Sequence, residues 1–87
     1  MIKAWADVAW DEYVDWQKTD KKTLNKINEL IKSIDRNGYN CVGKPEELHG
    51  NFAGYWSVHI DKKNRLIFLI DDDEIQIIRC GSHYDDR

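Results

Sequence analysis

Three side chains in the second half of the chain could together cleave RNA without a metal ion. Attack by the 2′-hydroxyl needs a base to take the hydroxyl proton, a cation to hold the phosphorane charge, and an acid to protonate the leaving 5′-oxygen. Glu46, Arg65 and His83 are suited to these three tasks. The histidine suits the acid, since its unperturbed pKa of about 6.5 lets it release a proton near neutrality. Tyr84 could orient this histidine or stack on a base.

Each of these residues also has an ordinary explanation. A glutamate that follows Pro45 in a loop is commonly solvated, and an arginine that begins a strand is commonly an ion-pair partner. A His-Tyr pair near a chain end is often part of a frayed terminus. The histidines at positions 49, 59 and 83 do not have metal-ligand spacing, so we expect no metal and no cofactor.

The overall charge argues against a uniformly basic RNA-binding surface. The 87 residues contain 13 Lys and Arg against 16 Asp and Glu, which gives a net charge of -3. Neutralising phosphates supplies much of the affinity of RNA-binding proteins. Any RNA site must therefore be a local basic patch on an acidic body, or another molecule must hold the RNA.

Length and composition predict a single domain over residues 1–87 with one core. No apolar run approaches the roughly 20 residues that span a bilayer, and the first residues lack the apolar region of a signal peptide. We therefore expect a cytoplasmic protein without membrane contact. Cys41 and Cys80 lie far apart and form no metal or redox motif, so we expect both to be reduced and structural.

A short strand and two helices are expected before the catalytic candidates. Residues 2–5 predict the strand, and helical spacing predicts a first helix from an N-cap at Asp7 to about Lys18. Thr19-Asp20 then caps a second helix that should end near residues 35–37, because Gly38 suits the left-handed position after a helix. Its apolar stripe consists of Leu24, Ile27, Leu30, Ile31 and Ile34.

After a loop predicted over residues 39–54, the hydrophobic period changes to two. It predicts strands at residues 55–60, 65–70 and 74–80 that form an antiparallel meander packed by one face on the helices. If the apolar residues of the first two strands face the helices, His59 and Arg65 share the opposite, open face. A four-residue turn would pair Ile60 with Arg65, so we predict a five-residue turn or a bulge at residues 60–64.

The order of these residues resembles the Txe/YoeB family of bacterial toxins, a branch of the RelE/ParE superfamily of toxin-antitoxin systems. The resemblance covers nearly the whole chain. It implies an α+β, RelE/YoeB-like fold with an N-terminal strand, a two-helix hairpin and then an antiparallel β-meander packed on the helices. The residues that carry it include Trp10-Asp11-Glu12-Tyr13, Trp16-Gln17-Lys18, Gly43-Lys44-Pro45-Glu46, Gly54-Tyr55-Trp56-Ser57, Arg65-Leu66, Cys80, His83 and Tyr84.

The resemblance implies a ribosome-dependent mRNA endonuclease that cuts in the A site through attack of the 2′-hydroxyl. By this resemblance Glu46 is the general base, Arg65 the phosphate clamp and His83 the general acid. Tyr84 positions the histidine, and Lys44 contacts phosphate. The family also implies a cognate antitoxin of the YefM/Phd-like kind, contacts with mRNA and rRNA, and a homodimer in some members.

The chain departs from the family in its positive charge. His49 and His59 stand where better-known members carry basic residues. The two histidines are either titratable RNA contacts or surface residues without a role. Two other interpretations stay open: a non-catalytic, ParE-like toxin that acts by macromolecular capture, and a weakened nuclease kept for regulation. The complete set of base, cation and acid favours the nuclease.

Overall fold

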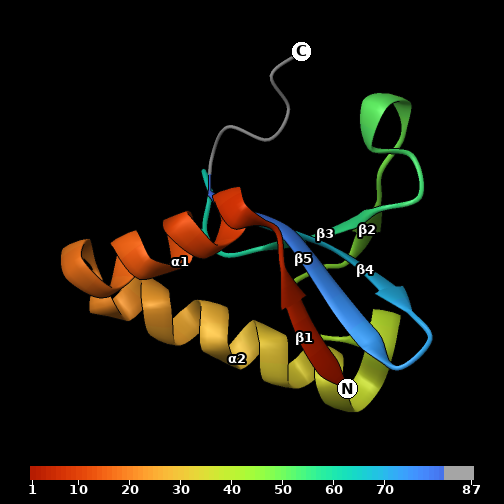
Figure 1. The fold of residues 1–87 in the computed structure, drawn as a ribbon, viewed down its shortest axis with the longest axis horizontal. Helices are drawn as coiled ribbons and strands as arrows, with labels where there is room; N and C mark the ends of the chain where they lie inside the picture. The colour runs from red at the N-terminus through yellow and green to blue at the C-terminus, as the bar shows by residue number, and fades with distance from the viewer. Residues whose placement is uncertain (82–87) are drawn as a thin grey trace.

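The computed structural model describes residues 1–81, and two helices pack on one face of a five-stranded sheet (Figure 1). The predicted α+β class, helical hairpin and antiparallel meander are confirmed. No helix among the described residues is both long and apolar enough to cross a bilayer. The elements are β1 (Ile2–Trp5), α1 (Asp7–Thr19), α2 (Lys21–Asn37), the 3-10 turn η1 (Gly38–Asn40), β2 (Glu46–Glu47), the 3-10 turn η2 (Gly50–Phe52), β3 (Trp56–His59), β4 (Arg65–Asp71) and β5 (Glu74–Gly81).

Helix α2 forms where its cap and its apolar stripe predict it. The Asp20 side chain accepts hydrogen bonds from the backbone N–H groups of Lys22 at 3.1 Å and Thr23 at 3.2 Å. These bonds satisfy donors that the first helical turn leaves open. After the helix, Gly38 has a φ of 61°, which favours glycine. The buried stripe consists of Ile27, Leu30, Ile31 and Ile34.

The predicted start of helix α1 is wrong by one residue. Ala6 occupies the N-cap position without a side-chain hydrogen bond, and Asp7 is the first helical residue. A carboxylate there still favours the helix, because the first turn carries the positive end of the helix dipole. The joint between the helices is the single residue Asp20, which follows Thr19 and precedes α2.

The strand predicted at residues 2–5 is confirmed as β1, whereas the other edge strand, β2, was not predicted. Strand β1 pairs parallel with β5, with Ile2 opposite Glu74. Strand β2 lies at the other edge and pairs antiparallel with β3, in the order β1-β5-β4-β3-β2. The predicted loop over residues 39–54 is therefore wrong at residues 46–47, because a two-residue strand is too short to show a period. This correction places Glu46 on the sheet.

The predicted register between β3 and β4 is confirmed. His59 pairs with Arg65, which leaves five residues in the turn at 60–64. Asp61 closes this turn by accepting hydrogen bonds from the backbone N–H groups of Lys63 at 2.8 Å and Asn64 at 2.7 Å. Burial raises the pKa of the Asp61 carboxyl, but the hydrogen bonds from Asn64 and Lys63 outweigh it, and the net shift is downward.

A bulge in β5 keeps the core continuous. Ile67 pairs with Arg79 and Phe68 with Ile77, so Ile78 is an extra residue on the β5 side. In a regular strand without a bulge, Ile77 and Cys80 are three positions apart and would point to opposite faces of the sheet. With it, both belong to the buried cluster between sheet and helices, together with Ala9, Ile27, Leu30, Ile31, Ile34, Cys41, Val58, Ile60, Leu66, Phe68 and Ile75.

Candidate functional site

The face of the sheet away from the helices carries the predicted base and cation. Alternation along β3 and β4 directs Ser57, His59 and Arg65 to this face, which we call the open face. Cross-strand pairing places Glu46 opposite Ser57 and Arg65 opposite His59. By ordinary strand spacings, the Cα atoms of Glu46 and Arg65 lie about 12 Å apart. Their two long side chains can therefore approach one phosphodiester from two sides.

The Glu46 and Arg65 side chains have no charged partner among residues 1–81. The Glu46 carboxylate is exposed and forms neither an ion pair nor a side-chain hydrogen bond with a described residue. Arg65 donates from Nη1 to the backbone oxygen of Asp61 at 3.4 Å and has no described ion pair. A carboxylate and a guanidinium left unpaired on one face are available to a ligand.

The open face is less exposed than the sequence predicted. Ser57 is 1% exposed and Ile67 is fully buried, although neither belongs to the cluster on the helix side. The site is therefore a charged surface with a buried floor.

A glycine holds Lys44 next to this face. The backbone N–H of His59 donates to the carbonyl oxygen of Gly43 at 2.8 Å, which joins the loop to β3. Gly43 has a φ of 97°, and a Cβ there would lie 2.8 Å from Leu30 Cδ2 and 3.1 Å from Val58 Cβ. Only glycine allows the loop backbone to lie this close to Leu30 and Val58. The loop therefore fixes Lys44 beside His59.

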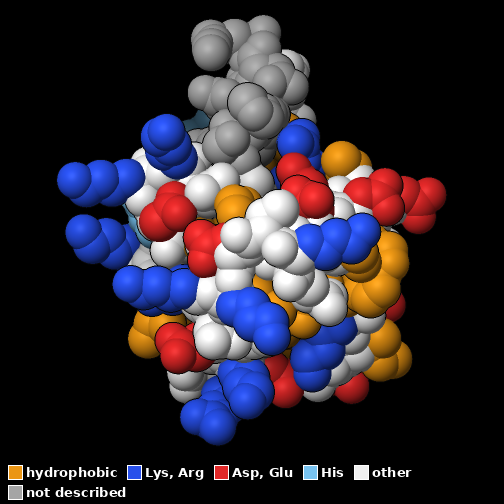
Figure 2. All heavy atoms as spheres, turned by 90° about the vertical axis from the view of Figure 1, so that its left-hand side faces the viewer, with side chains coloured by type: hydrophobic (Ala, Val, Ile, Leu, Met, Phe, Trp, Pro, Cys, Tyr) orange, Lys and Arg blue, Asp and Glu red, His pale blue; other side chains and the backbone are white. Residues whose placement is uncertain are grey.

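A basic groove continues from Lys44 toward the start of α2. Figure 2 shows Lys and Arg side chains gathered over the end of the molecule where α1 ends and α2 begins. The acidic residue in the groove, Asp61, is hydrogen-bonded within its own turn. The groove is a local basic patch on an acidic body. We call it the lysine groove and define it by Lys22, Lys26, Lys44 and Lys62, which line two adjoining hollows with His59, Ile60 and Asp61.

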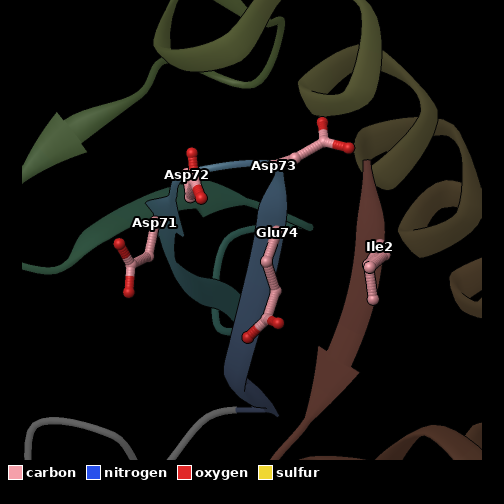
Figure 3. Close-up of a pocket in the computed structure, with 5 residues that line it drawn as sticks. All are labelled: Ile2, Asp71, Asp72, Asp73 and Glu74. Carbon is pink, nitrogen blue, oxygen red and sulfur yellow. The ribbon is translucent and has the colours of Figure 1, made fainter.

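Negative charge gathers at the other end of β4. The turn from β4 to β5 carries Asp71, Asp72, Asp73 and Glu74, which line an open pocket with Ile2 (Figure 3). In Figure 3 these carboxylates point in different directions. Over residues 1–81 the structure has no group of three side chains able to hold a metal ion. The acidic turn is separated from the lysine groove by the length of β4.

Sequence reasoning missed the contacts that hold the end of β5. Beyond Ile77 this strand has no β1 residue beside it, and α1 satisfies its backbone instead. Glu12 Oε1 accepts from the Cys80 N–H at 2.8 Å, and Trp16 Nε1 donates to the Cys80 oxygen at 2.8 Å. These side chains replace a neighbouring strand, as buried backbone groups require.

Glu12 also forms an ion pair with Arg79 Nη2 at 2.9 Å. A Cβ at Gly81 would lie 2.6 Å from Glu12 Oε2, so a larger residue there would have to move the Glu12 carboxylate. We call Glu12, Trp16, Arg79, Cys80 and Gly81 the β5 clamp. Its only sequence signal was the matching of Glu12, Trp16 and Cys80 to the family pattern.

The structure brings some predicted residues together and separates one. Lys44 and His59 line the same groove, and Arg65 faces His59 across the strands. His49 occupies the N-cap position of η2 and does not line the groove. His83 and Tyr84 lie outside the described residues, and their roles stay predictions.

Comparisons with known proteins find relatives over nearly the whole chain. The profile of a family described as the YoeB-like toxin of bacterial type II toxin-antitoxin systems matches residues 5–84. Toxin YoeB of Escherichia coli K12 is 44% identical over 80 residues, which are 92% of this chain and 95% of the relative. Toxin RelK of Mycobacterium tuberculosis is 40% identical over 76 residues, 87% of this chain and 89% of the relative.

Solved structures share the fold. A YoeB/ParE toxin from Agrobacterium tumefaciens has a TM-score of 0.92 and 37% identity, covering 97% of this chain and 100% of that one. A heterotetrameric YoeB-YefM complex from Staphylococcus aureus has a TM-score of 0.90 and 44% identity, covering 97% of this chain and 98% of that one. A YoeB dimer from the same organism has a TM-score of 0.89 and 44% identity, with the same coverage.

Proposed function

Because the chain belongs to the family of YoeB-like toxins of bacterial type II toxin-antitoxin systems, we propose that it is an endoribonuclease that cleaves mRNA on the ribosome without a metal ion. One observation carries the proposal. Glu46 and Arg65 project from either side of β3 onto one face without ion-pair partners among residues 1–81, and the lysine groove opens beside them.

The proposed reaction uses the phosphate and the neighbouring 2′-hydroxyl. Glu46 takes the hydroxyl proton as the 2′-oxygen attacks phosphorus, and Arg65 holds the negative charge that develops on the phosphorane. The bond from phosphorus to the 5′-oxygen breaks as His83 gives that oxygen a proton, with Tyr84 orienting the histidine. The products are a 2′,3′-cyclic phosphate and a 5′-hydroxyl.

The lysine groove provides the proposed grip on RNA. Lys44 lies beside His59 on the rim of the catalytic face, while Lys22, Lys26 and Lys62 extend the positive charge away from it. Each phosphate neutralised there releases counterions and adds affinity. This arrangement explains how a chain of net charge -3 holds RNA. His49, at the start of η2, is a separate proposed contact beyond β2.

The relatives suggest two protein partners. The Staphylococcus aureus YoeB structures include a complex with YefM and a YoeB dimer. We propose that this chain is likewise held by a cognate YefM/Phd-like antitoxin and forms a homodimer. Action on mRNA in the ribosomal A site places the protein in the cytoplasm.

The test is to map cleavage on translating ribosomes. The 5′ ends of a defined mRNA are mapped for the wild type, Glu46→Ala and His83→Ala. We expect strong A-site cuts with the wild type and only a slow residual rate with these two variants. Glu47→Ala is the matched control, because Glu47 is equally an exposed β2 glutamate but points to the other face. It should cut normally. Growth inhibition that persists in Glu46→Ala and His83→Ala would instead support capture without cleavage.

A further inference from the structure

Ser57 holds an unexplained polar atom. Among the described side chains, its hydroxyl oxygen is the buried nitrogen or oxygen atom that has no hydrogen-bond partner. The residue is 1% exposed. A buried hydroxyl without a partner destabilises the folded state, because it has given up water and gained nothing in return. Such a group calls for a reason other than stability.

The register places this hydroxyl next to the proposed base. Ser57 lies directly opposite Glu46 in the β2–β3 pair. The backbone hydrogen bond from Leu48 N to the Tyr55 oxygen, at 2.9 Å, continues the ladder between β2 and β3 and fixes which of their residues lie opposite each other. Residues directly opposite point to the same face with Cβ atoms about 5 Å apart. A serine hydroxyl and a glutamate carboxylate can meet across that distance.

The other neighbours of Ser57 on this row offer nothing to bond. Across β4 the row continues to Ile67, which is apolar and fully buried. Directly opposite on β2, Glu46 has acceptor capacity to spare, since its carboxylate is exposed and has no partner among residues 1–81. Over residues 1–81 this carboxylate is exposed, and the serine hydroxyl opposite it has no hydrogen-bond partner.

We infer that Ser57 is a positioning residue for Glu46. When RNA covers the face and displaces water, the serine hydroxyl donates to one carboxylate oxygen and leaves the other directed at the 2′-hydroxyl. This donor favours the ionised carboxylate that a general base requires. Ser57 also lies on a paired strand, so forming this hydrogen bond costs little conformational entropy. The inference rests on the proposed function of Glu46 as the base.

The test separates positioning from packing. Ser57→Ala removes the hydroxyl and leaves the β-carbon, so the melting temperature should stay the same or rise. Single-turnover cleavage of mRNA on ribosomes should slow by about ten- to a hundredfold, as expected for losing one hydrogen bond to a charged group. The acid limb of its pH–rate profile should move to higher pH. Ser57→Thr keeps the hydroxyl and should recover most of the cleavage rate, whatever its melting temperature.

A double mutant identifies the residue through which Ser57 acts. In a Glu46→Ala background, Ser57→Ala should cause no further loss, because its partner is gone. Wild-type cleavage by Ser57→Ala, or a rate loss that follows a fall in melting temperature, would overturn the inference. Cleavage by Glu46→Ala at the wild-type rate would instead remove the proposed function on which it rests.

Discussion

Glutamate and arginine occur together in two regions of this protein, and the two regions use them in opposite ways. In the β5 clamp, Glu12 and Arg79 meet at 2.9 Å with side chains 21% and 19% exposed, and Glu12 also accepts from the Cys80 backbone. On the open face, Glu46 and Arg65 form no ion pair with any residue in 1–81. The first pair joins a helix to a strand, and the second leaves both charges unpaired among the described residues.

The strand order keeps Glu46 and Arg65 from forming an ion pair with each other. Strand β3 lies between β2 and β4, so Glu46 faces Ser57 and Arg65 faces His59. A carboxylate directly opposite the arginine would hold it in place and occupy its donors. The separation across β3 keeps the two charges apart on one face of the sheet. Residue type alone therefore does not distinguish an arginine held in an ion pair from one left open to a ligand, but the partners do.

The largest effect should come from Arg65→Ala. Removing a donor aimed at developing charge typically lowers the cleavage rate by about a hundred- to a thousandfold. The free energy of unfolding should change by less than about 0.5 kcal/mol, since Arg65 makes one long bond to a backbone oxygen. Single-turnover cleavage on ribosomes and urea denaturation measure the two quantities. Arg79→Ala is the matched control and should show a clear loss of stability. Normal cleavage by Arg65→Ala would mean that the unpaired arginine, like Arg79, has no part in cleavage.

The next effect should come from Glu12→Ala. This change removes the partner of Arg79 and the acceptor of the Cys80 N–H together. We expect the free energy of unfolding to fall by about 2–3 kcal/mol, as for charged hydrogen bonds in a partly buried site. Glu46→Ala, measured in the same urea titration, should leave it nearly unchanged. Equal losses in the two variants would mean that the clamp holds no more tightly than the open face.

The sequence was sufficient where a local pattern repeats. The apolar stripe of α2 and its cap at Asp20 predicted the helix, and alternation around the turn at 60–64 predicted that His59 faces Arg65. Those interactions occur between near neighbours or along one strand. They need no knowledge of how distant segments meet.

The same sequence could not give the β5 clamp or the partner of Glu46. The bonds of Trp16 and Glu12 to Cys80 join residues 64 and 68 positions apart. No local period records such contacts. Strand β2 has two residues, so nothing showed that Glu46 would pair with Ser57. The lysine groove likewise requires α2 and the β3–β4 turn to be placed side by side.

A smaller effect should follow from Lys26→Gln in the lysine groove. Loss of one phosphate contact should weaken binding to ribosome-bound mRNA and reduce the slope of log affinity against log salt by about 1. Affinity is measured over a series of salt concentrations. Lys3→Gln is the control, because Lys3 lies on β1 at the far edge of the sheet. If both variants change the slope equally, the charge acts through the whole molecule and the groove has no special part.

The smallest effect should appear in the pH dependence of the clamp. Burial raises the pKa of the Cys80 thiol to about 12, and the neighbouring Glu12 charge adds to the shift. Its ordinary value is 9.0, so the unfolded chain releases this proton first. The stabilising contribution of the thiol is thus complete below pH 9 and declines as pH rises toward 12. In a Cys41→Ala background, the melting temperature should fall more steeply above pH 9 with Cys80 present than with Cys80→Ala.

Alkylation at pH 8 tests the same point without unfolding the protein. A thiol that stays protonated and buried should resist iodoacetamide in the folded Cys41→Ala protein and react once urea unfolds it. The Glu12→Ala change should speed the reaction by opening the clamp. If Cys80 in the folded protein reacts as fast as in urea, the clamp opens readily in solution. The contrast between a closed clamp and an open face with unpaired charges would then no longer hold.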